Sequence, residues 1–551
     1  MTARARIPAT FQTPLALMRT FLLLTFAVSF ITTSNLTFAS AVDAETQSAS
    51  IALAQEPPQL NGMKATDQVS IQVLSHVMEG LTRYDRRGML SPGVALRWEI
   101  SDEKATFWLR DNARWSNGDP VTAHDFVFAW RTVVTPSTAS EYAFILYPIK
   151  HAEAINRGER PATDLGVRAL DDFTLEVELE RPTAYFLKLT AFVSYFPVQE
   201  AFYQSTQGAY AADADKLLYN GAFRISNWVH SASLTMLKNE RYWDRDAIFL
   251  NKLDHAYITA DTRARLNLYV DDEIAFTRID GETYKDALAN KLRIRNFVTG
   301  SVFFLEFNHR AGRVTDNLNL RRALLAAFDP EEFVNRVLQM PGNLPGRSLF
   351  PVWLQGVEGK FRDEFPASER TPNIDEAKAY LEAAKKELGL DEIPPLALLV
   401  SDSPTATKQA EYLQGLYKSK LGLDIRIDVQ TFKQRLAKMT AGEFDIVGAG
   451  WGPDFDDIMT FGDLFASWNL NNRGRYSNAN YDEAVRTTMN ATDPAIRMQA
   501  MAAVQKIVEE DVVIVPLYEQ GVIYLLHPKL RGVRRTVVGG DPDFTYARVV
   551  P

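Results

Sequence analysis

Alternating hydrophobic and polar residues predict a strand in the first third of the chain. From Phe173 to Leu179 every second residue is hydrophobic and the residues between are polar, which is the two-residue period of a half-buried strand. A turn-forming Asp-Asp pair at 171–172 precedes this run, and Pro182 follows it. We therefore expect a strand over residues 173–179.

Two later segments have the spacing of amphipathic helices. Asp493 and Pro494 form an N-cap and first-turn pair, so we expect a helix from there to about Val508. A second helix is expected from Asp375 to Leu388, where Gly389 can end it. The residues expected on the buried faces are Ile496, Ala500, Val504 and Ile507 in the later helix, and Ala377, Leu381, Ala384 and Leu388 in the earlier one.

Strand and helix signals alternate along the whole chain, which favours an α/β or α+β fold over a helix bundle or a sandwich. No repeat of fixed period appears, so solenoids and propellers are not expected. Residues 340–366 contain four prolines and four glycines with little periodicity. That pattern is typical of an extended surface loop or of a simple irregular connection.

The first 41 residues have the features of a secretory signal peptide. Arg4, Arg6 and Arg19 precede an apolar run at 21–31, and small residues follow at 39–41. The apolar run is shorter than the roughly 20 residues that a transmembrane helix needs. We therefore expect residues 1–41 to be removed on export, and the mature chain not to span a membrane.

Composition narrows the possible functions. The chain has 551 residues, 46% hydrophobic and 23% charged, as in an ordinary globular protein with several packed units. Its net charge of −9 lacks the positive excess that binding to phosphate backbones uses, so nucleic acid is not an expected partner. The absence of cysteine excludes disulfides, thiolate metal sites and a lipid-modified N-terminal cysteine. An exported chain without that lipid anchor indicates the periplasm of a Gram-negative bacterium.

Familiar catalytic motifs are missing from the sequence. It contains no Gly-x-Ser-x-Gly elbow, no phosphate-binding glycine-rich loop and no His-Glu-x-x-His pair. His309 lies three residues after Glu306, but a single histidine near a strand end is usually hydrogen-bonded or solvated. We expect no catalytic residue, no metal site and no cofactor.

Residues 450–457 mix glycine, aromatic and acidic residues after a strand-like run at 444–449. Glycines admit the close approach of another backbone, the Trp451 indole offers a flat apolar wall, and a carboxylate at a strand end can pair with a cation. The segment is therefore a candidate ligand-binding edge. A solvated acidic turn is the alternative. A calcium loop built from Asp454, Asp456 and Asp457 lacks the remaining ligand spacing.

Four separated segments resemble the oligopeptide-binding proteins of bacterial ABC importers, within family 5 of the extracellular solute-binding proteins. They are Arg114–Val127, Pro161–Asp172, Tyr219–Phe223 with Asn239–Trp243, and the Trp451 segment, and they occur in the same order as in that family. The resemblance runs from about Ile51 to the C-terminus.

The resemblance implies a periplasmic-binding-protein-like α/β fold, bilobal with an extra inserted lobe. Lobe I would comprise 42–78, 201–299 and 520–551, lobe II would be an insertion at 79–200, and lobe III would span 300–519. The ligand cleft would lie between lobes I and III. The two crossings between these lobes, near Gly300 and near Gln520, would act as a hinge.

The resemblance also implies how a peptide would be held. Exposed main-chain edges at 66–68 and 450–452 would add the ligand as a strand, and Asp454 would pair with its α-ammonium group. The implied ligand-binding residues are Thr66, Asp67, Gln68, Tyr142, Phe432, Gly450, Trp451, Gly452 and Asp454. Relatives often carry basic residues where this chain has Met439 and Gly448, so the site for the ligand's C-terminal carboxylate is left open.

The implied function is that of a monomeric periplasmic component of an ABC peptide importer. It would capture oligopeptides largely independently of their sequence and deliver them to the permease subunits of the inner membrane. The same fold binding a dipeptide, a murein peptide, haem or a nickel chelate is the alternative. A periplasmic hydrolase that uses Asp454, Asp456 and Asp457 is a more remote one.

Overall fold

The computed structural model describes residues 40–551, which pack as one unit. Residues 1–39, and with them nearly all of the predicted signal peptide, lie outside the described residues. The last two residues of the predicted signal peptide are described. Ser40 donates a hydrogen bond to Asp272 Oδ2 (2.7 Å), and the Ala41 N–H donates one to the Asp272 carbonyl (2.6 Å). No helix among residues 40–551 combines the length and hydrophobicity needed to cross a membrane.

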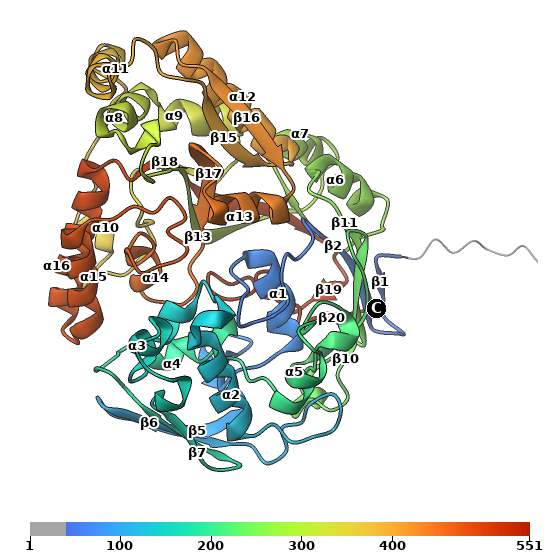
Figure 1. Ribbon diagram of the computed structural model, residues 1–551. Coiled ribbons are helices and arrows are strands. Elements are labelled where there is room, and N and C mark those ends of the chain that lie inside the picture. The colour runs from blue at the N-terminus through green and yellow to red at the C-terminus, as the bar shows by residue number, and fades with distance from the viewer. Residues whose placement is uncertain (1–39) are drawn as a thin grey trace, which may run out of the picture. The chain divides into compact units, whose positions relative to one another are not determined.

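A four-stranded antiparallel sheet is built from the first third of the chain, at the lower end of Figure 1. Its order is β5 (Ala95–Ile100), β6 (Lys104–Leu109), β8 (Thr174–Glu178) and β7 (Val167–Asp171). Helix α2 (Ala123–Val134) packs on β7 and β8. Strand β8 confirms the strand predicted over 173–179.

A five-stranded sheet joins the start of the described chain to residues 223–258. Its order is β1 (Val42–Asp43), β2 (Ser48–Leu53), β11 (Lys252–Ile258), β10 (Ser233–Lys238) and β9 (Phe223–Val229). Strands β2 and β11 are parallel, and the other neighbours are antiparallel. Residues far apart in sequence are thus neighbours in one sheet.

A seven-stranded mixed sheet carries the second half of the chain. Its order is β12 (Phe276–Ile279), β18 (Ile514–Leu526), β13 (Ile294–Phe307), β17 (Ile446–Trp451), β15 (Leu396–Ser401) and β16 (Ile425–Gln430), with β14 (Leu344–Pro345) beside β18. The long strands β13 and β18 shift register between Val298 and Val302. In this stretch Gly300 has a φ of +74°, which favours glycine, and Thr299 Oγ1 donates to the Gln520 carbonyl (3.2 Å).

Helices cover the seven-stranded sheet and the segments next to it. They are α8 (Leu318–Ala327), α11 (Ile374–Leu388), α12 (Pro404–Leu421), α13 (Phe432–Ala441), α15 (Ala479–Asn490) and α16 (Pro494–Glu510), while α1 (Gln68–Val77) lies near the centre of Figure 1. Helix α11 ends at Gly389 in a left-handed conformation, and the Asp493 side chain caps α16. Both predicted helices are therefore confirmed.

The prediction for one residue on the buried face of α16 is wrong. Ile496 is 51% exposed, whereas Arg497 beside it is buried and forms an ion pair with Asp457. The inward face of α16 is thus rotated toward Arg497 and Met501, because a buried polar partner, which hydrophobic spacing cannot detect, fixes the helix orientation.

Residues 340–366 are an irregular connection that packs onto the core, which confirms the second of the two interpretations of this segment and not the extended surface loop. Leu349, Phe350, Leu354 and Phe361 are buried, and a short helix, α10 (Phe361–Glu364), lies near its end. The apolar residues between the prolines and glycines provide the contacts that hold it in place.

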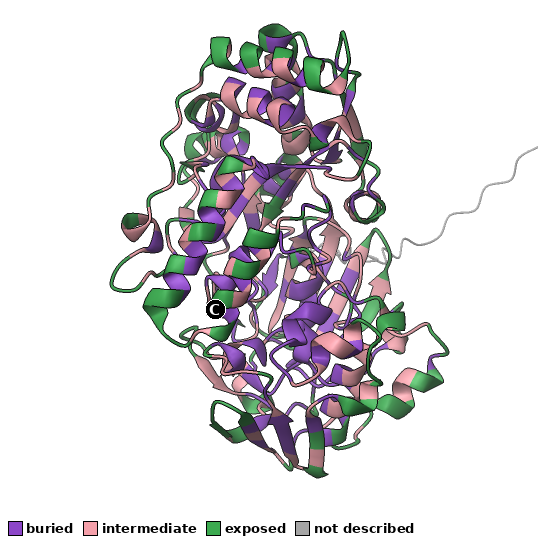
Figure 2. Ribbon diagram, turned by 60° about the vertical axis from the view of Figure 1, so that its left-hand side comes forward, coloured by how far each residue is buried: buried purple, intermediate pink, exposed green. Residues whose placement is uncertain are grey.

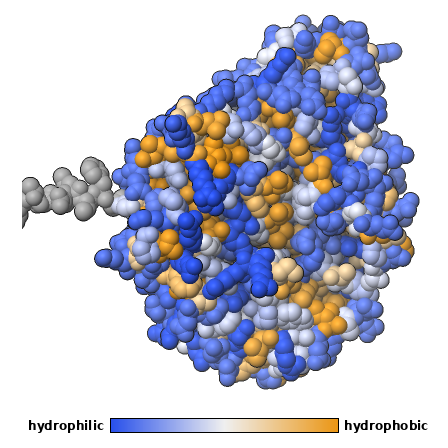
Figure 3. Space-filling model, turned by 180° about the vertical axis from the view of Figure 1, so that it is seen from behind, coloured by the Kyte–Doolittle hydropathy of each residue, from blue (hydrophilic) through white to orange (hydrophobic). Residues whose placement is uncertain are grey.

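Shorter elements complete the fold. They are β3 (Thr82–Tyr84), β4 (Leu90–Pro92), α3 (Ala152–Asn156), α4 (Phe186–Leu189), α5 (Glu200–Ser205), α6 (Thr262–Val270), α7 (Gly281–Ala289), α9 (Pro330–Glu332), α14 (Met459–Gly462), β19 (Leu530–Arg531) and β20 (Arg548–Val549). Figure 2 shows buried strands and helices with exposed outer faces. On the rear face, hydrophobic residues form several separate groups among hydrophilic ones (Figure 3).

Candidate functional site

A cavity of about 470 Å³ lies between the start of α1, helix α13, strands β13 and β17 and the loop at 536–541. This volume is within the range of about 300–1,000 Å³ typical of small-ligand sites. All nine predicted ligand-binding residues line it: Thr66, Asp67, Gln68, Tyr142, Phe432, Gly450, Trp451, Gly452 and Asp454. The fold therefore brings residues from distant parts of the sequence to one cavity.

Asp454 is a buried carboxylate at one end of this cavity, 7% exposed. The Tyr142 hydroxyl donates a hydrogen bond to Asp454 Oδ2 (2.8 Å). Burial raises the pKa of Asp454 to about 7, and the hydrogen bond from Tyr142 offsets a part of that effect. Within residues 40–551 it has no ion-pair partner, so Asp454 can accept a cation from a ligand.

Thr460 fixes the position of the Trp451–Asp454 segment. Its Oγ1 accepts a hydrogen bond from the Asp454 N–H (2.8 Å), and its carbonyl accepts one from Trp451 Nε1 (2.6 Å). The rings of Tyr142 and Trp451 lie 6.4 Å apart between centroids. The indole is thus held as a wall of the cavity beside the carboxylate.

Strand β17 has an open edge in the cavity. It pairs with β13 along its whole length, but with β15 at Ile446 and Val447 alone among the described residues. Residues 448–451 all line the cavity and have no strand on their β15 side. At Gly450 an added Cβ would lie 2.7 Å from the Phe303 ring, so close packing against β13 requires glycine. The open edge presents main-chain groups that another strand can pair with.

The second predicted edge, at 66–68, is the beginning of a helix. Gln68 is the first residue of α1, and Asp67 is its N-cap, whose carboxylate accepts from the Ser70 N–H (2.8 Å). Burial raises the pKa of Asp67 to about 6. Thr66 Oγ1 accepts a hydrogen bond from Arg473 (3.1 Å). The side chains of Thr66 and Asp67 thus already have hydrogen-bond partners within the protein. This segment contributes the N-terminal end of helix α1 to the cavity.

Sequence reasoning missed three arginines and an asparagine that line the cavity. Arg473 forms an ion pair with Glu141, and Arg278 forms one with Asp541 (2.9 Å). Arg435 is 9% exposed and donates to the Gly448 carbonyl (2.8 Å). The one local signal for it is its position, one helical turn after Phe432.

Asn471 is 3% exposed, and both its amide atoms lack a hydrogen-bond partner within the described part of the chain. Buried amides are normally paired, so this side chain is available to the donor and acceptor groups of a ligand. Its local sequence, a short run with several asparagines, does not single it out.

The positions of Met439 and Gly448 bring no charge to the cavity. Both line it, and Met439 is buried. An added Cβ at Gly448 would meet Val400 Cγ1 at 3.5 Å, which is an ordinary contact, so the backbone does not require glycine there. Any cation for this end of the cavity must come from another residue.

The acids that follow Asp454 have partners of their own. Asp456 pairs with Lys188 (3.1 Å), and Asp457 pairs with Arg497. Since the three carboxylates have different partners, they do not form a coupled acid–base pair. Among residues 40–551, no group of three or more His, Cys, Asp or Glu side chains is placed to hold a metal ion.

A strand edge and a buried carboxylate that line one cavity, in a mixed α/β molecule with several sheets, are the features expected of a solute-binding protein of the periplasmic-binding-protein type. The model of bacterial extracellular solute-binding proteins, family 5 Middle, matches residues 89–472. The chain belongs to this family.

Characterised relatives agree with the family. The oligopeptide-binding protein OppA of Bacillus subtilis is 31% identical over 492 residues, 87% of this chain and 88% of the relative. The substrate-binding domain of an oligopeptide ABC transporter from Bacillus anthracis matches with a TM-score of 0.88 and 35% identity, over 92% and 99% of the two chains. Listeria monocytogenes OppA bound to peptide matches with a TM-score of 0.86 and 32% identity, over 92% and 99%.

Two forms of one relative differ in their similarity to this structure. The murein tripeptide-binding protein MppA of Escherichia coli matches with a TM-score of 0.84, and its unliganded open form with 0.60. Each is 28% identical; the first match covers 93% of this chain and 100% of MppA, and the second 93% and 99%. The described conformation therefore differs from the open form.

Proposed function

We propose that this protein is the periplasmic solute-binding component of an ABC peptide importer and that it captures oligopeptides in the cavity beside β17. The names of its relatives support this function: OppA of Bacillus subtilis is an oligopeptide-binding protein, and the Listeria structure contains a peptide. A haem or a nickel chelate has no peptide main chain that could pair with an open strand edge. The ligand class therefore follows from the site.

The open edge of β17 next to Asp454 is the observation that carries this proposal. A peptide can add to residues 448–451 as a strand, so that its N–H and C=O groups are satisfied by the main chain. Its α-ammonium group then reaches Asp454, whose pKa of about 7 falls when the cation arrives. The buried carboxylate thereby obtains the partner that it lacks in the free protein.

Main-chain pairing also accounts for broad specificity. Every peptide has the same backbone and the same ammonium group, so these contacts do not depend on its side chains. Water in the cavity can satisfy polar side chains of different shapes. The protein binds and releases the peptide unchanged, and hydrolysis of ATP takes place in the transporter.

Capture would involve closure of two lobes, with 42–78, 201–299 and 520–551 on one side and 300–519 on the other. Lobe II, residues 79–200, is the insertion. The register shift near Gly300, opposite Gln520, lies where β13 and β18 each pass from one of these lobes to the other. It provides a hinge at that place. The two TM-scores for MppA support a fold with an open and a closed form. The exported monomer would then present its closed form to the permease.

Peptides that differ at the N-terminus test the proposal. Isothermal titration with a free tripeptide and its N-acetylated form should give clearly weaker binding of the acetylated one, because acetylation removes the charge that pairs with Asp454. Recovery of the intact peptide by mass spectrometry checks that no cleavage occurs. Equal affinity for the two forms would refute the role of Asp454. A lack of binding to any peptide would refute the function.

A further inference from the structure

The open edge of β17 lies between two different environments. Alternate residues of a strand point to opposite faces of its sheet, and β17 follows this rule. Val447 packs into the core that contains Met439 of α13. Ile446 packs into the core that contains Leu413 of α12. The two helices lie on opposite sides of β15 and β17 in Figure 1. A peptide strand added to this edge therefore directs its side chains alternately toward α13 and toward α12.

The side toward α13 contains charged groups. Glu306 of β13 lies opposite Val447 and shares its face. Arg435 belongs to α13 itself and lines the cavity. Arg473 lines the cavity too and donates to Thr440 Oγ1 of α13 (3.4 Å). Polar and charged side chains of a ligand thus meet hydrogen-bonding groups on this side.

The side toward α12 has space beside the strand. Gly448 lies opposite Leu305 of β13 and shares its face, which belongs to the core with α12. A Cβ added at Gly448 would lie 3.5 Å from Val400 Cγ1, so the missing side chain leaves room between the strand and Val400. We call this part of the cavity the α12 pocket. It is lined by Phe303, Leu398, Val400, Ala410, Leu413 and Tyr518.

The six side chains of the α12 pocket carry no charge. All are hydrocarbon apart from the hydroxyl of Tyr518, whose ring stacks on Phe303 with 4.7 Å between centroids. Thr405 and Gln409 of α12 also line the cavity and add polar but uncharged groups. A ligand side chain that enters this pocket exchanges water for apolar contacts, which favours a hydrocarbon side chain and disfavours an unpaired amide or charge.

We propose that the α12 pocket selects an apolar side chain of the peptide, so that this protein prefers peptides with a residue such as leucine at the position that faces α12. This inference rests on the proposed peptide-binding function and narrows its ligand class. Because the side chains of an added strand alternate, the neighbouring positions face α13 and are not selected in this way. One face of the ligand is thus selected for its polarity, and the other admits varied side chains.

A peptide series tests this alternation without altering the protein. Leucine and asparagine have nearly the same shape and differ in polarity, so each is placed at position 1, 2, 3 or 4 of tetraalanine. Isothermal titration of the wild type should show leucine bound about tenfold or more tightly than asparagine at one position, or at two positions separated by one residue. At the neighbouring positions the two peptides should differ by less than about threefold.

The series separates this inference from the function on which it rests. Tight binding with a leucine-to-asparagine ratio below about threefold at every position would overturn the α12 pocket and leave the peptide function intact. A preference for leucine at two adjacent positions would also overturn it, because adjacent side chains of a strand cannot enter one face. Failure of all eight peptides to bind would contradict the peptide function itself.

Gly448→Val and Ala406→Asn provide matching changes in the protein. The first fills the α12 pocket from the strand, and the second adds an amide to the cavity from α12, so each should lower the leucine-to-asparagine ratio toward one. Gly415→Val is the control: Gly415 is on the exposed side of α12, an added Cβ there meets nothing within 4 Å, and the wild-type ratio should remain. An undiminished ratio in either pocket variant would overturn the proposal.

Discussion

Asp454 and Asp543 are buried to the same extent, 7% exposed each, yet their pKa values move in opposite directions. Burial raises the pKa of Asp454 to about 7; the hydrogen bond from Tyr142 offsets only a part of this effect, and no cation pairs with the carboxylate in the described chain. Burial also acts on Asp543, but Arg534 and His76 outweigh it and hold the pKa of Asp543 below its ordinary value. The neighbours, and not the burial, decide the charge.

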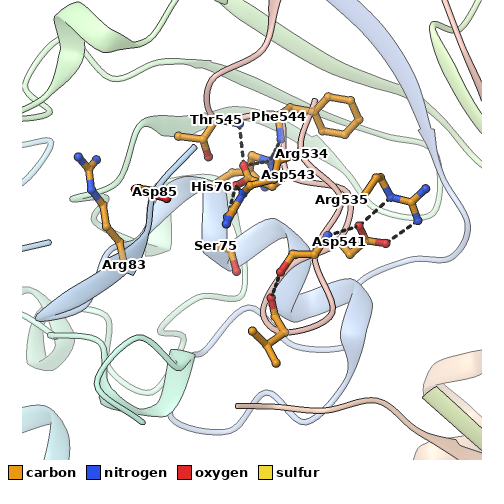
Figure 4. Close-up of polar contacts among 12 residues, drawn as sticks. Ser75, His76, Arg83, Asp85, Arg534, Arg535, Asp541, Asp543, Phe544 and Thr545 are labelled. Atoms are coloured by element: carbon orange, nitrogen blue, oxygen red, sulfur yellow. Dashed lines mark hydrogen bonds and ion pairs between the residues drawn. The ribbon is translucent and has the colours of Figure 1, made fainter. Parts of the chain in front are cut away.

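Figure 4 shows the hydrogen bonds that hold the carboxylates around Asp543. Asp543 accepts from Arg534 Nε (3.0 Å) and from the Thr545 N–H (2.7 Å), and His76 Nε2 accepts from the Phe544 N–H (2.9 Å). Asp541 in the same loop accepts two hydrogen bonds from Arg535 (2.8 and 2.7 Å). Each carboxylate of this loop has an arginine partner, although Nη1 of Arg534 and Nη1 of Arg535 have no hydrogen-bond partner in the described chain, whereas Asp454 in the cavity has no cation. Buried charge is structural in the first region and available to a ligand in the second.

The largest expected effect is on the stability of the paired region. Asp543→Asn leaves Arg534 without its anion, and the loss of one partner of a buried pair should lower the free energy of unfolding by about 3–5 kcal/mol. Urea denaturation of the ligand-free protein measures it. Asp213→Asn is the control: the side chain of Asp213 is 55% exposed, and the expected change is below about 0.5 kcal/mol. An equal change in the free energy of unfolding for Asp543→Asn and Asp213→Asn would contradict the structural role of the buried, paired carboxylate.

Asp454→Asn should act on binding instead of stability. The amide oxygen can still accept from Tyr142, and the substitution removes a buried carboxyl group that lacks a cation, so the free energy of unfolding should not fall. Binding of a free tripeptide should weaken by about 2–5 kcal/mol, as for the loss of one partner of a desolvated charge pair. Denaturation and isothermal titration on one preparation measure both. A loss of stability as large as that of Asp543→Asn would contradict the distinction.

The smallest expected change, when counted per pH unit, is in the pH dependence of stability. The pKa of Asp454 is raised from 3.8 to about 7, so its contribution to stability is fully present below pH 3.8 and is lost as the pH rises through 7. The stability of Asp454→Asn relative to wild type should thus increase by up to about 1.4 kcal/mol per pH unit over this window. Asp543 contributes in the opposite sense, because its pKa is lowered: its stabilisation is lost as the pH falls below 3.8.

Peptide affinity should follow the same carboxylate. The ammonium group of a ligand needs ionised Asp454, so affinity should fall by up to about tenfold per pH unit below pH 7. N-acetylated peptides should lack this slope. Titrations between pH 5 and 7.5 measure it, and identical slopes for both ligands would assign the pH dependence to another group.

Local patterns predicted the elements whose stability is local. Strand β8 and the ends of α11 and α16 follow from alternation, N-caps and a terminal glycine. The orientation of α16 did not, because the Arg497–Asp457 ion pair joins residues 40 positions apart. The packing of residues 340–366 was missed for a similar reason, since isolated apolar residues acquire a core only from distant segments.

The candidate site was predicted through family motifs, and its charge pattern was not. The nine residues named from the resemblance line one cavity, whereas Arg435 and Asn471 were overlooked. Both line the cavity and have buried atoms without a hydrogen-bond partner in the described chain, and a missing partner can be recognised only when all neighbours in space are known. Sequence shows which groups a chain contains, and the fold shows which of them remain unpaired.

The open edge of β17 has a consequence for solubility. Unpaired strand edges on a protein surface are templates for aggregation, because any extended chain can add to them. Here residues 448–451 line a cavity of about 470 Å³ together with the start of α1, helix α13 and the loop at 536–541. These surrounding elements stand between the edge and the strand of a folded neighbour, so we expect the protein to keep the edge for its ligand at high concentration without joining to its own copies.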